Sequence, residues 1–281
     1  MSINDNQTRR ELLKTGLVGI SGAAVGASSS VLAAEAQENS ERMEKVRYSE
    51  LLPHEFRKRL AEKPLAYLPM GTLEWHGEHL PIGSDAIQCE ELMLECARQY
   101  GGIVLPPIHT GPGPTKLMDD GRLLIGMDFW NNVVDPPRQL DGDCYWIPDG
   151  LFISLIDAIL TQLKRTGFQA VFADGHGPSR GSWTRELKRR EAHFGMKLFG
   201  ATSDNQRPWK SQIDHAARNE TSLMQHYRPD LVDLSQLPQS RSVWPLGVSG
   251  EDPRDATAEH GKECKNASIE LMIQKFREAG I

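Results

Sequence analysis

The sequence lacks several features that would assign it to common functional classes. It has no uninterrupted apolar run of the roughly 18 to 20 residues that a membrane-spanning helix requires, so we expect no membrane anchor. It has no excess of basic residues either, since 32 Lys and Arg stand against 38 Asp and Glu and the formal net charge is −6. This mildly acidic balance excludes the electrostatic footprint of a nucleic-acid-binding domain.

Cysteine is scarce, and the spacing of the four cysteines indicates no disulfide scaffold. No CxxC pair occurs. Cys89 and Cys96 are seven residues apart in an expected helix, which separates them by about 10 Å at 1.5 Å rise per residue. That distance is too long for a disulfide, whereas a bridge between Cys144 and Cys264 remains open.

The first 36 residues resemble an export signal. The arginine pair Arg9 and Arg10 precedes a weakly apolar stretch rich in Gly, Ala and Ser, and the tripeptide Ala-Glu-Ala ending at Ala36 offers a small-residue cleavage site. This order of features predicts a twin-arginine signal peptide over 1–36, export to the periplasm and a polar linker over 37–47. The alternative is a disordered tail that contains a chance arginine pair.

The rest of the chain alternates short apolar runs with longer amphipathic segments. This periodicity predicts strands at 64–71, 101–108, 168–175 and 196–203, and helices at 48–62, 85–100, 149–166, 179–194, 214–227 and 255–279. The alternation predicts one domain over 48–281, a three-layer α/β/α sandwich around a mainly parallel sheet. Residues 109–148 are irregular and rich in Gly, Pro and Asp, and a loop of this length is usually functional or disordered.

Residues 71–85, GTLEWHGEHLPIGSD, gather metal-capable side chains directly after the first expected strand. Side chains two residues apart in an extended segment point the same way, so Glu74 and His76 face one side together. The glycines and the proline let the chain turn back, and Asp85 then begins the next helix. Ligands bind at the carboxyl ends of parallel strands, so we expect a site here, with Glu78 and His79 as supporting residues.

Two further segments carry histidine and carboxylate at comparable positions. In ADGHGPSRGS, His176 directly follows another expected strand. In DHAARNETS, His215 and Glu220 are five residues apart, so they reach one site only if the helix begins between them or meets the site end-on. Each segment alone is more typical of a capped loop or an exposed helix, but the three together predict a metal site. Mixed imidazole and carboxylate ligands suit Zn, Mn or Fe.

These segments resemble the signatures of the creatininase family of metal-dependent amidohydrolases. GTLEWHGEHLPIGSDA is similar to the first family motif, ADGHGPSRG to the second and HAARNETSLMQHYRPDLVDL to the third, and the resemblance extends from about residue 47 to 235. The resemblance implies a creatininase-like fold, a homo-oligomer that is commonly a hexamer, and two divalent ions per subunit. It implies the following roles: Asp85 bridges both ions, Glu74 and His176 bind one, His76 and Glu220 bind the other, and His215 transfers protons.

The chain also departs from the family pattern. Pro178 occupies the position at which creatininase itself uses a glutamate ligand, which is why Glu220 takes that role here. Ser211 stands where the creatinine-hydrolysing enzymes carry a tryptophan, and Ala217 stands where a glycine is usual. The resemblance therefore extends to the family but not to creatinine as the substrate.

The implied activity is hydrolysis of the C–N amide bond, cyclic or linear, of a small molecule by a metal-bridged hydroxide. Two alternatives stay open at this point. The first is a non-catalytic periplasmic metal- or solute-binding protein on the same fold, which predicts that Glu220 and His215 are not both at the metals. The second is a deformylase or peptidase built on the same scaffold.

Overall fold

The structure, a computed structural model, describes residues 45–130, 133–201 and 214–281. The expected signal peptide, most of the expected linker and Ser211 lie outside these residues. The compact unit that carries the fold spans Val46–Ile281. Val46 is buried, and its carbonyl accepts a hydrogen bond from the Val104 N–H at 2.8 Å. Val46 therefore packs as part of this compact unit.

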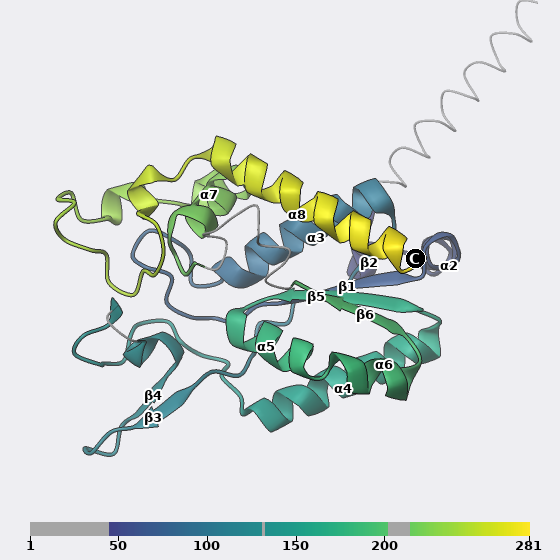
Figure 1. Cartoon of the computed structure of the whole chain (residues 1–281), viewed down its shortest axis with the longest axis horizontal. Coiled ribbons are helices and arrows are strands. Elements are labelled where there is room, and N and C mark those ends of the chain that lie inside the picture. The colour runs from purple at the N-terminus through teal and green to yellow at the C-terminus, as the bar shows by residue number, and fades with distance from the viewer. Residues whose placement is uncertain (1–44, 131–132, 202–213) are drawn as a thin grey trace, which may run out of the picture. The chain divides into compact units, whose positions relative to one another are not determined.

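A four-stranded parallel sheet forms the centre of the domain (Figure 1). Its strands are β1 (Leu65–Met70), β2 (Ile103–Val104), β5 (Ala170–Gly175) and β6 (Lys197–Gly200), and their spatial order is β2-β1-β5-β6. All three strand pairs are parallel, and β1 pairs with β5 along its full length. The carboxyl ends of β1 and β5 therefore lie side by side at one edge of the sheet.

Helices cover both faces of this sheet, which confirms the three-layer α/β/α prediction. Helices α3 (Ser84–Tyr100) and α8 (Ala258–Glu278) pack on one face, where Leu65 and Tyr67 of β1 belong to the same buried cluster as Met93 and Phe276. The other face carries α4 (Asp149–Thr166), α5 (Gly177–Arg185) and α6 (Leu187–Phe194). There the alternate β1 residues Ala66, Leu68 and Met70 pack with Phe152 and Trp183. Because both faces are covered, all six residues of β1 are buried.

Several expected elements differ in detail. The helix expected over 48–62 is a short 3-10 turn, Tyr48–Glu50, followed by α2 (Pro53–Glu62). Pro53 explains the break, because a proline favours the first helical position and pushes the preceding residue, Leu52, into an extended conformation. The helix expected over 179–194 is likewise divided, with α5 and α6 meeting at Glu186.

The strand expected over 101–108 is reduced to the two residues of β2, since Pro106 and Pro107 supply no N–H to a ladder. Residues 109–148 hold a small antiparallel hairpin that the sequence did not predict. It consists of β3 (Thr115–Leu117) and β4 (Leu123–Ile125), and a 3-10 turn over Gly126–Phe129 follows it. This segment is therefore more regular than expected.

All four cysteines are free thiols, so Cys144, which is exposed, and Cys264, which is buried, form no bridge in this structure. Among the described residues, no helix combines the length and the apolar character that crossing a membrane requires.

Candidate metal centre

The end of β1 and the first turn of α3 approach each other closely, and this contact brings two parts of the first motif together. A Cβ added at Gly71 would lie 2.4 Å from the Cβ of Ala86, so only glycine allows this spacing. The N–H of Glu74 donates to the carbonyl of Ile82 at 3.2 Å, which closes the connecting loop on itself. Asp85 consequently lies beside the loop that carries Glu74 and His76.

Glu74, Asp85 and His176 form a first group of possible metal ligands, with one ligand atom from each lying within 4.8 Å of the others. His176 is the residue before the first turn of α5, directly after β5. Its Nε2 is 3.6 Å from Glu74 Oε1, whereas its Nδ1 is hydrogen-bonded to Ser179 Oγ at 3.0 Å. A hydrogen bond at the far ring nitrogen is the usual way in which a protein orients a metal-binding histidine.

His76, Asp85 and Glu220 form a second group that shares Asp85 with the first. His76 Nε2 lies 3.6 Å from Asp85 Oδ1 and 3.8 Å from Glu220 Oε2. The Nδ1–H of His76 can donate to the backbone carbonyl of Glu74 at 3.1 Å. His76 Nε2 and Asp85 Oδ2 are both buried without a hydrogen-bond partner among the described residues. Buried polar atoms rarely lack a partner. A bound cation would supply one here, because both atoms have a lone pair with which to bind it.

The pKa shifts in this cluster reflect buried charges that need compensation. Burial by itself would lower the pKa of His76, but Asp85, Glu220 and Glu74 together outweigh this effect, and the pKa of His76 rises to about 10. Burial raises the pKa of Glu220 to about 7 and raises the pKa of Glu74 well above its usual value. Burial lowers the pKa of His176 to about 4. Three carboxylates in one buried volume repel one another, so positive ions would stabilise their charged forms.

His215 lies at the same centre but in a different orientation. Its Nε2 is 2.7 Å from the carbonyl oxygen of Trp75, and its Nδ1 is 3.9 Å from Glu74 Oε1. Its ring centroid is 4.4 Å from that of His76, and burial lowers the pKa of His215 to about 3. One ligand atom from each of Glu74, His76 and His215 also lies within 4.8 Å of the others, so the geometry alone is compatible with His215 as a metal ligand and as a proton-transfer residue.

Helix α7 (Arg218–Tyr227) begins between His215 and Glu220, four residues later than the predicted start at 214. The side chain of Asp214 accepts hydrogen bonds from the N–H groups of Asn219, at 2.7 Å, and Glu220, which satisfies the first turn of the helix. Because the helix begins between His215 and Glu220, both side chains reach one site. Their spacing of five residues had set this condition. The non-catalytic alternative predicted that they would not both lie at the centre, and the structure brings them together there.

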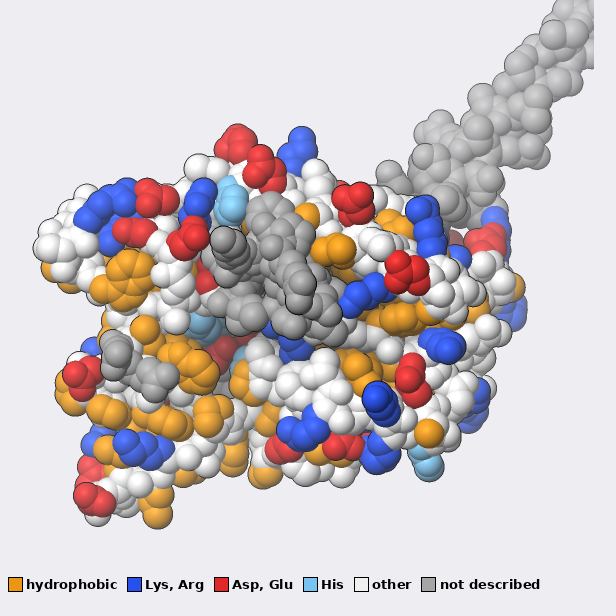
Figure 2. Space-filling model, in the orientation of Figure 1, with side chains coloured by type: hydrophobic (Ala, Val, Ile, Leu, Met, Phe, Trp, Pro, Cys, Tyr) orange, Lys and Arg blue, Asp and Glu red, His pale blue; other side chains and the backbone are white. Residues whose placement is uncertain are grey.

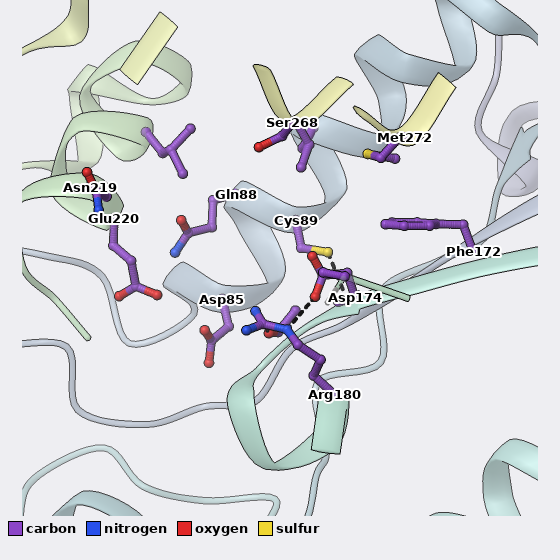
Figure 3. Close-up of a pocket in the computed structure, with 14 residues that line it drawn as sticks. Asp85, Gln88, Cys89, Phe172, Asp174, Arg180, Asn219, Glu220, Ser268 and Met272 are labelled. Carbon is purple, nitrogen blue, oxygen red and sulfur yellow. Dashed lines mark hydrogen bonds and ion pairs between the residues drawn. The ribbon is translucent and has the colours of Figure 1, made fainter. Parts of the chain in front are cut away.

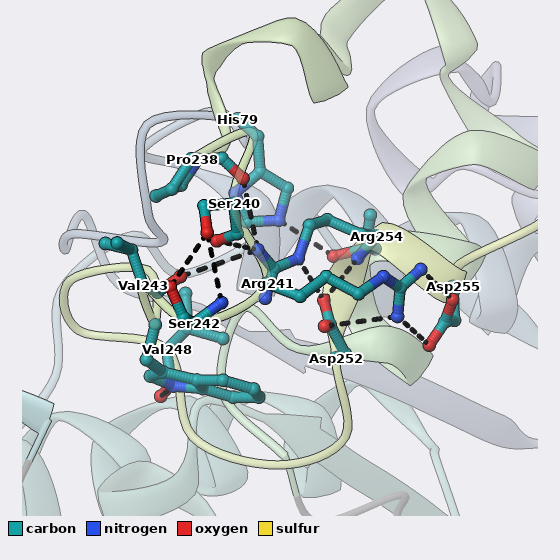
Figure 4. A network of polar contacts seen from close by, with 12 residues as sticks. His79, Pro238, Ser240, Arg241, Ser242, Val243, Val248, Asp252, Arg254 and Asp255 are labelled. Atoms are coloured by element: carbon teal, nitrogen blue, oxygen red, sulfur yellow. Dashed lines mark hydrogen bonds and ion pairs between the residues drawn. The ribbon is translucent and has the colours of Figure 1, made fainter.

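A polar network holds the segment that supports His215 (Figure 4). The backbone of His215 pairs with that of Ser249 in both directions, at 2.8 and 2.9 Å. Close to this point, Asp252 accepts hydrogen bonds from Arg254 and Arg241, while Arg254 also donates to the carbonyls of Pro238 and Ser240. These bonds link the chain before and after residue 249 and fix the strand-like pairing of His215.

Residues that support the ligands were only partly anticipated. His79 is a supporting residue as expected, because its Nε2 is 2.9 Å from Thr221 Oγ1, whereas Glu78 is exposed. Ser179 and Asp143 were missed. Ser179 could have been found from its position three residues after His176, in the first turn of the helix that His176 precedes. Asp143 accepts from the Trp75 N–H at 2.8 Å across 68 residues of sequence, and no local pattern indicates such a contact.

A cavity of about 200 Å³ opens in front of the candidate ligands. Glu74, Asp85, His176, His215 and Glu220 line one side of it. Its apolar wall is supplied by residues of the irregular segment 109–148, namely Pro114, Gly126, Met127 and Trp130. The segment thus contributes to the site, as a functional loop would.

Comparisons with known proteins show the family and the fold of this chain. A family model described as creatinine amidohydrolase matches residues 49–127 and 142–276. A mycofactocin precursor peptide peptidase of Mycobacterium ulcerans (strain Agy99) is 22% identical over 249 residues, which is 76% of this chain and 84% of that protein.

Two solved creatininase structures are similar to this chain in fold. One is described as creatininase with Mn. It has a TM-score of 0.63 and 20% sequence identity, and the match covers 83% of this chain and 98% of that chain. The other is a mutant creatininase of Zn-Zn type, with a TM-score of 0.63, 19% identity and coverage of 83% and 98%.

Proposed function

This chain belongs to the creatininase family of amidohydrolases, and from that premise we propose that it hydrolyses the C–N amide bond of a small molecule at a centre of two divalent ions. The observation that carries the proposal is the pair of ligand groups that share Asp85. One carboxylate common to two adjacent groups is the arrangement that a two-metal hydrolase requires.

The residues present fit two ions. Glu74, Asp85 and His176 would hold one of them, and His76, Asp85 and Glu220 would hold the other. Imidazole and carboxylate together suit Zn, Mn or Fe, and relatives of this fold carry Mn or Zn. When bound, such ions would lower the pKa of a coordinated water and polarise an amide carbonyl.

His215 is the residue of this chain that we assign to proton transfer. Its Nε2–H is engaged by the Trp75 carbonyl, so the free ring nitrogen is Nδ1, which faces Glu74 and the cavity. From this position, Nδ1 can take up a proton and deliver it to the leaving nitrogen of the amide. The fixed Nε2 keeps the ring in a single orientation during that transfer.

The cavity determines what kind of molecule is bound. Its volume of about 200 Å³ suits a small amide or the end of a chain. Met127 and Trp130 would contact apolar parts of the substrate and exclude water from the side opposite the ligands.

A peptidase is the second candidate, and the observation that favours it is the curated relative described as a peptide peptidase. Because its volume of about 200 Å³ is small, the cavity would accept a peptide end more readily than the middle of a peptide. The deformylase alternative differs only in the acyl group removed and uses the same residues.

The test is a hydrolysis screen of the metal-loaded protein against cyclic amides, formamides, N-acylated amino acids and short peptides. We expect hydrolysis of at least one small amide, loss of that activity with a chelator and recovery when Mn or Zn is added back. Hydrolysis of peptides alone would favour the second candidate. If the protein binds both ions but hydrolyses none of these compounds, it is a non-catalytic binding protein.

A further inference from the structure

A second cavity of about 100 Å³ lies behind the candidate metal centre, and we call it the inner cavity (Figure 3). Residues of α3, β5, α5, α7 and α8 line it. It shares Asp85, Gly175, Arg180 and Glu220 with the cavity in front of the ligands, so the two cavities meet at the metal-binding side chains. Its volume accommodates a few non-hydrogen atoms, which is the size of one functional group of a substrate.

Arg180 is the one Lys or Arg among the described residues that line either cavity. Its Nε donates to Asp174 Oδ1 at 2.6 Å, and its Nη2 donates to the carbonyl of Gly175 at 2.7 Å. These two bonds orient the guanidinium and leave the N–H groups of Nη1 for a ligand. Figure 3 shows the guanidinium extending from α5 toward Asp85. A guanidinium held in this way is prepared to bind an anionic group.

Two further N–H donors face the same space. The side-chain nitrogens of Gln88 and Asn219 are both buried and have no hydrogen-bond partner among the described residues. The Asn219 amide is oriented by His260, whose Nε2 is 2.7 Å from Asn219 Oδ1, so the NH₂ group is the end that remains unpaired. Figure 3 shows both amides at the inner cavity with Arg180. Buried donors without acceptors destabilise a fold unless a ligand supplies the acceptor.

We propose that the inner cavity binds a carboxylate group of the substrate through Arg180, Gln88 and Asn219, so that the substrate is a small amide acid such as an N-acylated amino acid. This inference rests on the proposed amidohydrolase function of the same centre. Leu92, Phe172 and Met272 supply apolar walls beside the three donors, which suits a carboxylate on a short hydrocarbon stem.

Asp85, Asp174 and Glu220 also line the inner cavity, and their charges oppose the binding of a carboxylate. Asp174 is already paired with Arg180, which leaves the charges of Asp85 and Glu220 to be compensated. The two ions that these residues would hold reverse that effect, since two divalent cations bring four positive charges against the three carboxylates of Glu74, Asp85 and Glu220. Binding of the acid group therefore depends on a metal-loaded centre.

The first experiment compares N-acetyl amino acids with the matching N-acetyl amino alcohols, in which CH₂OH replaces the carboxylate. We expect the metal-loaded protein to prefer the acid by about 100-fold or more in kcat/KM, because the neutral hydroxyl group lacks the charge and the second oxygen with which a carboxylate accepts charge-assisted hydrogen bonds. Arg180→Gln should reduce this ratio at least about 10-fold, mainly through KM. Arg185→Gln is the matched control, because Arg185 is on the same helix but pairs with Asp149 at the surface. It should leave the ratio unchanged.

Gln88→Met is a second variant, because it removes a buried side-chain nitrogen that has no hydrogen-bond partner among the described residues. It should also reduce the acid preference, which keeps the test decisive if Arg180→Gln fails to fold. A ratio near one in the wild type, or an unchanged ratio in both variants, overturns the inference while the amidohydrolase function stands.

The second experiment measures calorimetric binding of propionate to the metal-loaded protein and does not depend on turnover. We expect affinity to fall at least about 10-fold in Arg180→Gln and to stay the same in Arg185→Gln. Binding that depends on Arg180 without hydrolysis of any amide would preserve the carboxylate site and reject the proposed function. Equal binding by the wild type and Arg180→Gln would reject the carboxylate site.

Discussion

The three histidines of the centre are fixed through different ring nitrogens. His76 and His176 are both held at Nδ1, by the Glu74 carbonyl and by Ser179, so that Nε2 faces the carboxylates. His215 is held at Nε2 by the Trp75 carbonyl, and its Nδ1 faces the centre instead. This opposite attachment distinguishes His215 from the other two and agrees with a separate role in proton transfer.

His215→Ala tests that role. We expect the variant to retain both ions and the fold, because the ligand groups on either side of Asp85 do not need His215. We expect its kcat to fall by about 10² to 10⁴, which is the usual contribution of general acid–base catalysis. Metal analysis and steady-state kinetics of the purified variant provide the measurement.

Glu220→Ala is the companion variant, and it should lose one ion because it removes a ligand of the second group. If His215→Ala loses metal while Glu220→Ala retains both ions and full activity, then the roles of the two residues are reversed.

At the scale of single residues, the sequence indicates the candidate ligands, which the structure brings together, but not the residues around them. Glu74, His76, Asp85, His176 and Glu220 stand at strand ends and helix starts, where the order of elements determines their position. Trp75 and Asp143 support the centre through a contact between distant parts of the chain. Such a contact depends on how the loop over 109–148 folds back, which local patterns do not encode.

The junction between β1 and α3 connects the fold to the site at the scale of elements. Gly71 and Ala86 allow the strand end and the helix to touch, and Asp85 is the residue next to this contact. A side chain at position 71 would separate the two elements and move Asp85 relative to both ligand groups.

Gly71→Ala should therefore lower the free energy of unfolding by about 1 to 3 kcal/mol and also weaken metal binding. Gly83→Ala is the matched control, because a Cβ at that position would have no neighbour closer than 3.7 Å. It should leave metal binding unchanged. Denaturant unfolding and metal titration of the two variants give the comparison, and equal metal affinity for both would reject the link between this contact and the site.

Elements with long, clear periodicity were predicted well, and those that depend on local chain breaks were not. The expected helix 149–166 has the same bounds as α4, and Gly167 ends it in the left-handed conformation with φ 111°. Pro53 divides the expected helix 48–62, although its preference for the first helical turn is a readable signal. The hairpin of β3 and β4 was missed because each strand has only three residues and lies among Gly and Pro.

At the scale of the whole molecule, apolar side chains are exposed on the segment that also lines the cavity. Leu117 and Leu123 of the hairpin are 73% and 49% exposed, and Tyr145 is 64% exposed. Figure 2 shows hydrophobic side chains gathered over the hairpin region. Exposed apolar surface of this kind is typical of a protein–protein interface.

We propose that this surface joins subunits in a homo-oligomer, as the family resemblance implies. Light scattering at micromolar concentration should give a mass several times that of one chain. The double variant Leu117→Lys with Leu123→Lys should dissociate the assembly, because it places like charges in an apolar contact. A strictly monomeric wild type would contradict the proposal.

Export is a second proposal at this scale, and it concerns residues outside the described part of the chain. The paired arginines and the weakly apolar stretch after them are the features on which it rests. Arg9→Lys with Arg10→Lys should retain the precursor inside the cell, which fractionation and immunoblotting would detect. Normal periplasmic levels of the variant would reject the twin-arginine assignment.

The central claim is that Asp85 joins two metal-binding groups in one centre, and the metal content of the purified protein tests it most directly. Elemental analysis after gentle purification should find close to two transition-metal ions per chain. Asp85→Asn should lower the occupancy of both positions, because this residue belongs to both groups. A wild-type content of zero or one, or an Asp85→Asn variant that still binds two ions with unchanged affinity, would contradict the claim.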